Sequence, residues 1–191
     1  IYGLGNIFSD QQRWEEAEKA YRQAIQLEPD SPEAHIALSF VLTQPVAGTD
    51  RSDRYQEAEK MARKAIQLDG NNAVAFDQLG VSLELKGAIG AETQTAYRKA
   101  IEFDPNFALA YAHLGRLLRR NGKANESSAA YRDAIRLASD VPTMILVADS
   151  KAAQPGAIMR EEMSYLQSIA SPQVKFGFWE GVALSVLEAM P

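Results

Sequence analysis

The chain has 191 residues, 46% of them hydrophobic and 24% charged, a composition typical of a folded globular protein. Its formal net charge of −5 disfavours a general nucleic-acid or anionic-membrane surface, and the lack of cysteine excludes disulfides, thiolate catalysis and cysteine-based zinc sites. No apolar run approaches the roughly 18 residues that a membrane-spanning helix needs. The length suffices for a sizeable core or for one repeat array.

Residues 1–31 are predicted to form two amphipathic helices. Leu4 and Phe8 lie four residues apart on one face of the first helix, and Ala17 and Tyr21 have the same spacing on the second. The small residues let the two helices approach closely, while the aromatic residues fill the space between neighbouring helix pairs. A proline ends the second helix because it cannot continue the backbone hydrogen bonding.

Residues 32–72 form a second, longer unit of the same kind. Ser39 stands where the first unit has a glycine. The extra length lies in residues 45–53, whose Pro, Gly, Thr, Asp and Ser are turn formers, so we expect a lengthened loop between the two helices. Loop closure costs little more for a longer loop, and this insertion is therefore expected to be dispensable for folding.

Residues 73–107 and 108–141 repeat the pattern twice more. One alanine marks the same place in every unit: Ala24, Ala65, Ala100 and Ala134. We expect these alanines at helix crossings, where a larger side chain would not fit. Beyond residue 141 the pattern decays, and residues 142–191 are predicted to contain a degenerate fifth unit and a C-terminal capping helix. The stretch 176–190 has apolar residues on most sides of a helix, so we expect it to be buried against another surface.

The order and spacing of these residues resemble the tetratricopeptide repeat, a helix–turn–helix unit of about 34 residues. The resemblance covers four units, residues 1–31, 32–72, 73–107 and 108–141. It implies an all-α fold, a right-handed α-α superhelix or solenoid of stacked antiparallel helix pairs. It also implies that His35, in a place where the family packs an aromatic ring, is a core residue rather than a ligand. The first helices would line a concave groove that binds peptides or helices of other proteins, without catalysis.

The family's groove-facing places identify the candidate partner-binding residues. They are Asn6, Ile36, Phe40, Val74, Gln78, Val81, Leu109, His113, Arg116, Arg119 and Arg120. Co-chaperone members hold a C-terminal carboxylate with a clamp of Lys, Asn and Arg, of which only Asn6 is present here. A receptor for chaperone tails is therefore disfavoured.

The candidate groove combines an apolar floor with a basic end. Arg116, Arg119 and Arg120 lie on one helical face, and arginine binds carboxylates with two parallel hydrogen bonds. We therefore expect a protein or peptide partner with apolar anchors and acidic residues, and no nucleic acid, membrane or cofactor. A solvated basic face is the alternative for the arginines, and the chain's own last helix or a second copy could cover the floor. Self-association could also involve the terminal helices.

An enzymatic alternative rests on residues 179–190, WEGVALSVLEAM. They resemble the donor-site end of retaining glycosyltransferases, in which two glutamates eight positions apart, here Glu180 and Glu188, contact the sugar nucleotide. The chain would then be the repeat-bearing fragment of a larger enzyme, and a simple apolar capping helix is the other interpretation. Because the sequence begins inside a repeat, we expect a fragment; its compartment is undetermined, with the cytoplasm as the default.

Overall fold

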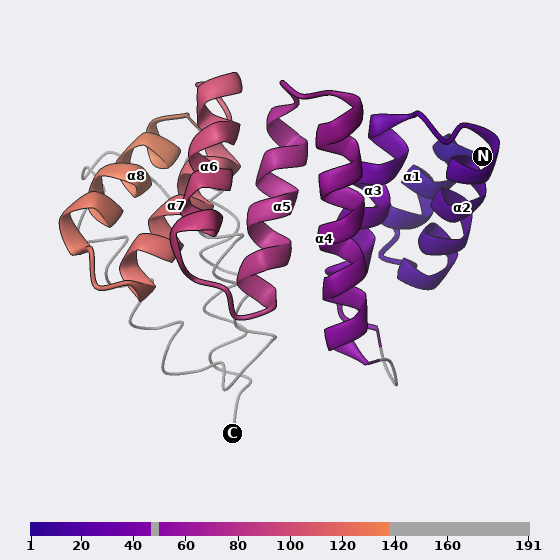
Figure 1. The fold of residues 1–191 in the computed structure, drawn as a ribbon, viewed down its shortest axis with the longest axis horizontal. Helices are drawn as coiled ribbons and strands as arrows, with labels where there is room; N and C mark the ends of the chain where they lie inside the picture. Colours follow the sequence, from indigo (N-terminus) through magenta and orange to yellow (C-terminus); the bar gives the residue numbers. More distant parts are fainter. Residues whose placement is uncertain (47–49, 138–191) are drawn as a thin grey trace. The chain divides into compact units, whose positions relative to one another are not determined.

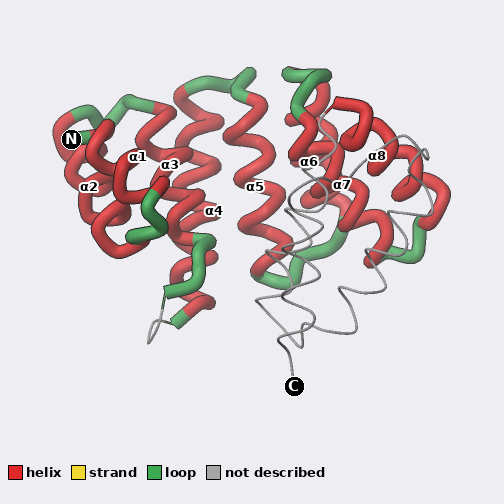
Figure 2. Tube along the Cα trace, turned by 180° about the vertical axis from the view of Figure 1, so that it is seen from behind, coloured by secondary structure: helices red, strands yellow, loops and turns green. Residues whose placement is uncertain are grey.

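The computed structural model describes residues 1–46 and 50–137, which consist of helices and connecting loops (Figure 2). The chain divides into two compact units, residues 1–105 and 106–191. The predicted fifth unit and capping helix of residues 142–191, and with them Glu180 and Glu188, lie outside the described residues.

Six helices make up the first unit, and they follow one another in chain order (Figure 1). They are α1 (Tyr2–Asp10), α2 (Trp14–Leu27), α3 (Pro32–Leu42), α4 (Arg51–Leu68), α5 (Ala73–Leu85) and α6 (Ala91–Phe103). Each odd-numbered helix pairs with the next, α2 packs on α3, and α4 packs on α5. The helices α3 and α5 also touch each other. The first unit is thus an all-α stack of helix pairs, which confirms the predicted fold class.

In the second unit the described residues form one further pair, α7 (Ala108–Arg120) and α8 (Ala124–Leu137). Ala112 of α7 and Ala134 of α8 are fully buried where the helices meet, and the half-buried Tyr111 packs against them. Of the described helices, none combines the length with the hydrophobicity that crossing a lipid bilayer requires.

Side-chain caps determine where several helices begin. Ser31 caps α3 by accepting a hydrogen bond from the Ala34 amide at 3.3 Å, and a proline occupies the first helical position. Asp50 caps α4 by accepting one from the Ser52 amide at 2.8 Å. The prediction of a loop over residues 45–53 was therefore wrong at its end, because the helix begins at residue 51. Part of the inserted length lengthens α4, which has 18 residues.

The alanines predicted at helix crossings are buried. Ala65, Ala100 and Ala134 are 0% exposed, and Ala24 is 7% exposed. Their lack of a longer side chain leaves room for the facing helix, because protein interiors are packed without spare volume. Their burial agrees with the prediction, and Ala134 is shown to pack with Ala112 of the facing helix α7.

A tyrosine of the second helix lies against a glycine of the first helix in three of the described pairs. The pairs are Gly5 with Tyr21, Gly80 with Tyr97, and Gly115 with Tyr131. A Cβ atom at Gly5 would lie 2.5 Å from Cε1 of Tyr21, closer than atoms pack. These tyrosines therefore lie against the glycine of their own helix pair. Tyr21, Phe8 and Trp14 also pack in one cluster with residues of the next pair, which agrees with the expectation that aromatic residues fill space between pairs.

The second pair, α3 and α4, has different residues at the places that the glycine and the tyrosine occupy in the other pairs. Ser39 stands in the glycine place, and Ala62, three residues before Ala65, stands in the tyrosine place. Both are fully buried, and the Ser39 hydroxyl donates a hydrogen bond to the carbonyl oxygen of Ala58 at 2.8 Å. The smaller alanine makes room for the serine side chain, whose polar group is satisfied within the pair.

Ion pairs connect the second helices of successive pairs in the first unit. Arg22 of α2 contacts Glu57 of α4 at 2.6 Å, and Arg63 of α4 contacts Glu92 of α6 at 2.6 Å. Hydrogen bonds from Arg22 lower the pKa of the Glu57 carboxyl, against the opposing effect of its partial burial. These contacts join neighbouring pairs in addition to the apolar packing.

Candidate partner-binding site

Five of the predicted groove residues lie on α3 and α5, two neighbouring first helices of the first unit. Ile36 and Phe40 belong to α3, while Val74, Gln78 and Val81 belong to α5. Residues three and four apart project from one side of a helix, so each helix presents its members together. Because α3 and α5 touch each other, the structure brings these residues to adjacent helices.

Two of these apolar side chains are exposed to an unusual degree for their size. Phe40 is 39% exposed and Val74 is 42% exposed. The ring of Phe40 meets that of Trp14 of α2 edge to face, with 6.1 Å between the ring centres. This contact fixes the orientation of Phe40, since edge-to-face pairs are favourable for aromatic rings. Sequence reasoning missed Trp14 as a neighbour of this surface; its position as the first residue of a second helix was the available signal.

Gln78 is more deeply buried than a groove-lining residue was expected to be. It is 9% exposed, and within the described residues its side-chain oxygen Oε1 is buried without a hydrogen-bond partner. Further along the same helix, Glu84 is 4% exposed and accepts a hydrogen bond from the Tyr97 hydroxyl at 2.9 Å. A buried acceptor without a donor costs free energy, and because this oxygen of Gln78 is buried it is not presented to a partner at the surface.

Asn6 lies on α1, and its side-chain amide serves the helix pair itself. The amide oxygen accepts a hydrogen bond from the Tyr21 hydroxyl at 2.8 Å. Asn6 was predicted to contact a partner, but its oxygen is already used within the pair. The bond also helps to hold the Tyr21 ring against α1, where Gly5 admits it.

The remaining predicted residues all lie on α7, in the second unit. Leu109 is 36% exposed and Arg120 is exposed, whereas His113, Arg116 and Arg119 are half-buried. Arg119 and Arg120 occupy the last turn of α7, where positive charge complements the negative end of the helix dipole. The apolar set on α3 and α5 and the basic set on α7 belong to different units, and each is a candidate surface by itself.

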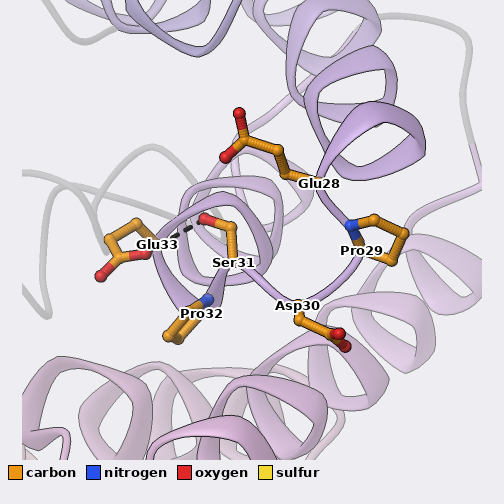
Figure 3. Close-up of a pocket in the computed structure, with 6 residues that line it drawn as sticks. All are labelled: Glu28, Pro29, Asp30, Ser31, Pro32 and Glu33. Atoms are coloured by element: carbon orange, nitrogen blue, oxygen red, sulfur yellow. Dashed lines mark hydrogen bonds between the residues drawn. The ribbon is translucent and has the colours of Figure 1, made fainter.

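A depression of about 460 Å³ lies at the connection between α2 and α3 (Figure 3). Its lining comprises Glu28, Pro29, Asp30, Ser31, Pro32 and Glu33. The Ser31 hydroxyl donates a hydrogen bond to the Glu33 carboxylate at 3.1 Å across it. The depression therefore belongs to a loop that is held by its own polar contacts, and no partner is assigned to it.

The described residues contain no group of three or more His, Cys, Asp and Glu side chains that could hold a metal ion. His35 is 4% exposed, and its Nδ1 atom lies 2.8 Å from the carbonyl oxygen of Ser31. The prediction that His35 is a core residue is confirmed. Its Nδ1 atom hydrogen-bonds with the backbone carbonyl oxygen of Ser31 at the start of α3.

Comparisons with known proteins agree with this architecture. A family model described as "TPR repeat" matches residues 5–44, and one described as "Tetratricopeptide repeat" matches residues 96–127. No curated protein matches the sequence.

Solved structures with the same fold share little sequence with this chain. A thermophilic TPR protein of Thermus thermophilus has a TM-score of 0.70 and 14% identity, covering 98% of this chain and 97% of its own. MamA has a TM-score of 0.59 and 18% identity, covering 87% of this chain and 92% of its own. YrrB, a TPR protein with an unusual peptide-binding site, has a TM-score of 0.56 and 16% identity, covering 98% of this chain and 90% of its own. At such identities the likeness is one of fold.

Proposed function

Because the chain belongs to the tetratricopeptide-repeat family, we propose that it is a non-catalytic scaffold that binds a peptide or helix of a partner protein on the first helices of its repeats. The observation that supports this most is the exposure of two large apolar side chains, Phe40 and Val74, on adjacent first helices. Clusters of this kind on soluble proteins usually mark interaction sites. The similar fold of YrrB, whose peptide-binding site is unusual, is consistent with the proposal.

The surface on α3 and α5 suits a segment with apolar anchors. Phe40, held by Trp14, gives a rigid aromatic contact, and aromatic residues often contribute most to binding at interfaces. Val74 and the half-buried Val81 extend the apolar area along α5.

A second contact is proposed for the basic residues of α7. Arg119 and Arg120 would pair with carboxylates of the partner, because guanidinium groups bind carboxylates in a fork geometry. Reversing both to glutamate should weaken binding and reduce its dependence on salt, since the attraction is electrostatic. Equal affinity and equal salt dependence for the reversed and wild-type proteins would remove the arginines from the binding site.

The experiment that tests the proposed function compares partners captured by the wild type and by a Phe40→Glu, Val74→Glu variant. A protein that binds the wild type and is lost from the variant would bind through this surface. Isothermal titration with the recovered partner should then show a loss of at least about tenfold in affinity, as expected when central anchors are removed. The mechanism predicts that each single substitution acts mainly by speeding dissociation.

A matched control is available on the same unit. Leu27, at the end of α2, is 65% exposed and lies outside the candidate surface. The Leu27→Glu variant makes the same kind of change at one exposed apolar position, to be compared with each single substitution, and it should capture the partner as the wild type does. If both variants lose the partner equally, or neither loses it, the surface on α3 and α5 is not the binding site.

A further inference from the structure

The first helices of the first unit carry charged side chains of one sign. The helices α1, α3 and α5 contain no lysine or arginine, and their carboxylates are Asp10, Glu33, Asp77 and Glu84. By contrast, the second helices α2, α4 and α6 each contain acidic residues together with lysine or arginine. Positive charge is therefore kept off the helices that present the exposed Phe40 and Val74.

Carboxylates of the second helices are compensated within the fold, whereas Glu33 is not. Four of them contact an arginine at 2.6–2.9 Å, namely Glu18, Glu57, Glu59 and Glu92. Glu33 of α3 is exposed and forms no ion pair within the described part of the chain, although it accepts a hydrogen bond from the Ser31 hydroxyl at 3.1 Å. Lys86, which follows α5, already contacts Glu59 at 2.5 Å. The charge of Glu33 is thus available to a partner.

Glu33 lies on the same side of α3 as the apolar residues of the candidate surface. Glu33, Ile36 and Phe40 are spaced three and four residues apart, so they form one stripe along the helix. Burial, and after it the negative charge of Glu33, raises the pKa of Tyr2, which shows that the carboxylate lies near α1. Because α3 also touches α5, where Val74 is exposed, the carboxylate borders the apolar surface.

Two further carboxylates make the start of α3 more negative. Glu28 and Asp30, in the loop before this helix, are exposed, and neither forms an ion pair with another described residue. Figure 3 shows that the side chains of Glu28, Asp30 and Glu33 point in different directions. They do not converge on a single ion, but together they create a negative potential at this end of the surface, which attracts cationic side chains.

Resting on the proposed function, we infer that the surface on α3 and α5 binds a cationic segment of a partner protein. Its apolar side chains pack on Phe40 and Val74, and its lysine or arginine residues lie toward Glu33. An acidic segment would meet only like charges on these helices, which is unfavourable. The exposed ring of Phe40 adds to the preference, because a cation is attracted to an aromatic face. The acidic partner expected from the sequence relies on the arginines of α7, which belong to the second unit.

The test uses the full chain and a library of random peptides displayed on phage. The peptides have about 16 residues, so that a helical one, about 24 Å long, can cross two helices packed about 10 Å apart. Peptides retained by the wild type should be enriched in lysine and arginine, relative to the unselected library. One retained peptide is then labelled and titrated with the wild type and its variants by fluorescence anisotropy, at low and at high salt.

Charge reversal at Glu33 tests the contact itself. Glu33→Lys should weaken binding by about fivefold or more at low salt, and by less at high salt, because attraction becomes repulsion. Glu33→Gln should give an intermediate affinity. Circular dichroism should show that the variants keep their helix content.

Asp53→Lys is the matched control for Glu33→Lys. Asp53 is also exposed, lies in the first turn of its helix and forms no ion pair within the described residues, but it belongs to the second helix α4. The control makes the same change in net charge and in the interaction with the helix dipole. It should bind the peptide as the wild type does, and a loss equal to that of Glu33→Lys would overturn the inference.

A Phe40→Ala, Val74→Ala variant separates failure of this inference from failure of the proposed function. Retained peptides that need Phe40 and Val74 but show no enrichment in lysine and arginine overturn the inference and leave the proposed function standing. The same holds for peptides that bind Glu33→Lys as tightly as the wild type. Peptides that bind the double variant as they bind the wild type, or the absence of any retained peptide, overturn the proposed function and this inference with it.

Discussion

The ring of Tyr97 occupies the space in which a Cβ atom of Gly80 would lie. Tyr97 is fully buried, and its hydroxyl donates a hydrogen bond to Glu84, so the ring cannot move aside without losing that bond. The contact joins α5 to α6 within one helix pair. Glycine is thus required at position 80 for close approach, although it lies in the middle of a helix.

We expect Gly80→Ala to lower the free energy of unfolding by about 1–2 kcal/mol, because overpacking outweighs the roughly 1 kcal/mol gain in helix propensity. Urea denaturation followed by circular dichroism measures the change. Gly3→Ala is the control, since a Cβ atom there meets nothing within 4 Å, and it should not destabilise the protein.

A double substitution tests the cause of that loss. Gly80→Ser combined with Tyr97→Ala copies the arrangement of Ser39 and Ala62 into α5 and α6. It should cost less than the two single changes together, with a coupling of about 0.5–3 kcal/mol. Strict additivity would mean that the glycine and the tyrosine do not constrain each other.

Gln12 adopts a left-handed backbone conformation, with φ of 57°, in the connection between α1 and α2. The corresponding connections of the third and fourth pairs have Gly87 and Gly122, with φ of 85° and 73°. A side chain disfavours this region by about 1–2 kcal/mol, while glycine loses more entropy on folding, so Gln12→Gly should stabilise the protein by about 0.5–1 kcal/mol.

Thermal unfolding tests this prediction, and the substitution Gly122→Ala tests it in the opposite direction. A Cβ atom at Gly122 meets no atom within 4 Å, so any loss of stability there arises from the backbone conformation. We expect Gly122→Ala to lower the melting temperature and Gln12→Gly to raise it. Changes of the same sign in both variants would contradict the explanation.

The ion pair of Glu57 with Arg22 predicts a dependence of stability on pH. Hydrogen bonding from Arg22 lowers the pKa of Glu57 below its usual value of 4.5, despite the opposing effect of burial. The ionised carboxylate therefore stabilises the folded state above the pKa of the unfolded chain, and this contribution is lost as the pH falls through the lower, folded-state pKa. Stability should decline on acidification below about pH 4.5.

Urea midpoints measured between pH 7 and pH 3 for the wild type and Glu57→Gln test this. The variant should be less stable at pH 7 and should lose less stability on acidification. The control is Glu15→Gln on the exposed part of α2, which should keep the wild-type slope. Parallel pH profiles for the wild type and Glu57→Gln would show that the ion pair makes no net contribution.

Ala100 of α6 is fully buried, and the equivalent alanines of the other pairs are buried as well. Ala100→Leu should destabilise the protein by about 1–3 kcal/mol, because the larger side chain overpacks the contact. Differential scanning calorimetry measures the shift in melting temperature. Thr95→Leu, at an exposed position of the same helix, should leave the melting temperature nearly unchanged.

The helix pairs and their buried small residues could be predicted because their signals are local. Apolar periodicity defined the helices, and the recurrence of alanine and glycine marked the close contacts. The start of α4 was missed because the turn-forming residues Ser52 and Asp53 also suit the first turn of a helix, once Asp50 caps it. At such places the same residues can either begin a helix or form a loop, and amino-acid composition alone does not distinguish the two structures.

The candidate site was predicted less completely, because burial depends on helices distant in sequence. Phe40 and Val74 were assigned to an exposed surface and are exposed. Gln78 was assigned to the same surface and is buried, and Leu4 was assigned to the core and is exposed. In both cases the repeat pattern gives the face on which a residue lies, but not whether another helix covers that face.

The exchange of glycine and tyrosine for Ser39 and Ala62 in the second pair restricts how these repeats can evolve. A serine introduced first would clash with the ring, and an alanine introduced first would leave a cavity, so either single step passes through a less stable protein. Wherever stability limits function, the intermediate with only one of the two substitutions is less fit than either the Gly–Tyr or the Ser–Ala combination. A repeat that has taken one solution will tend to keep it, and neighbouring repeats can diverge in sequence while their backbones remain alike.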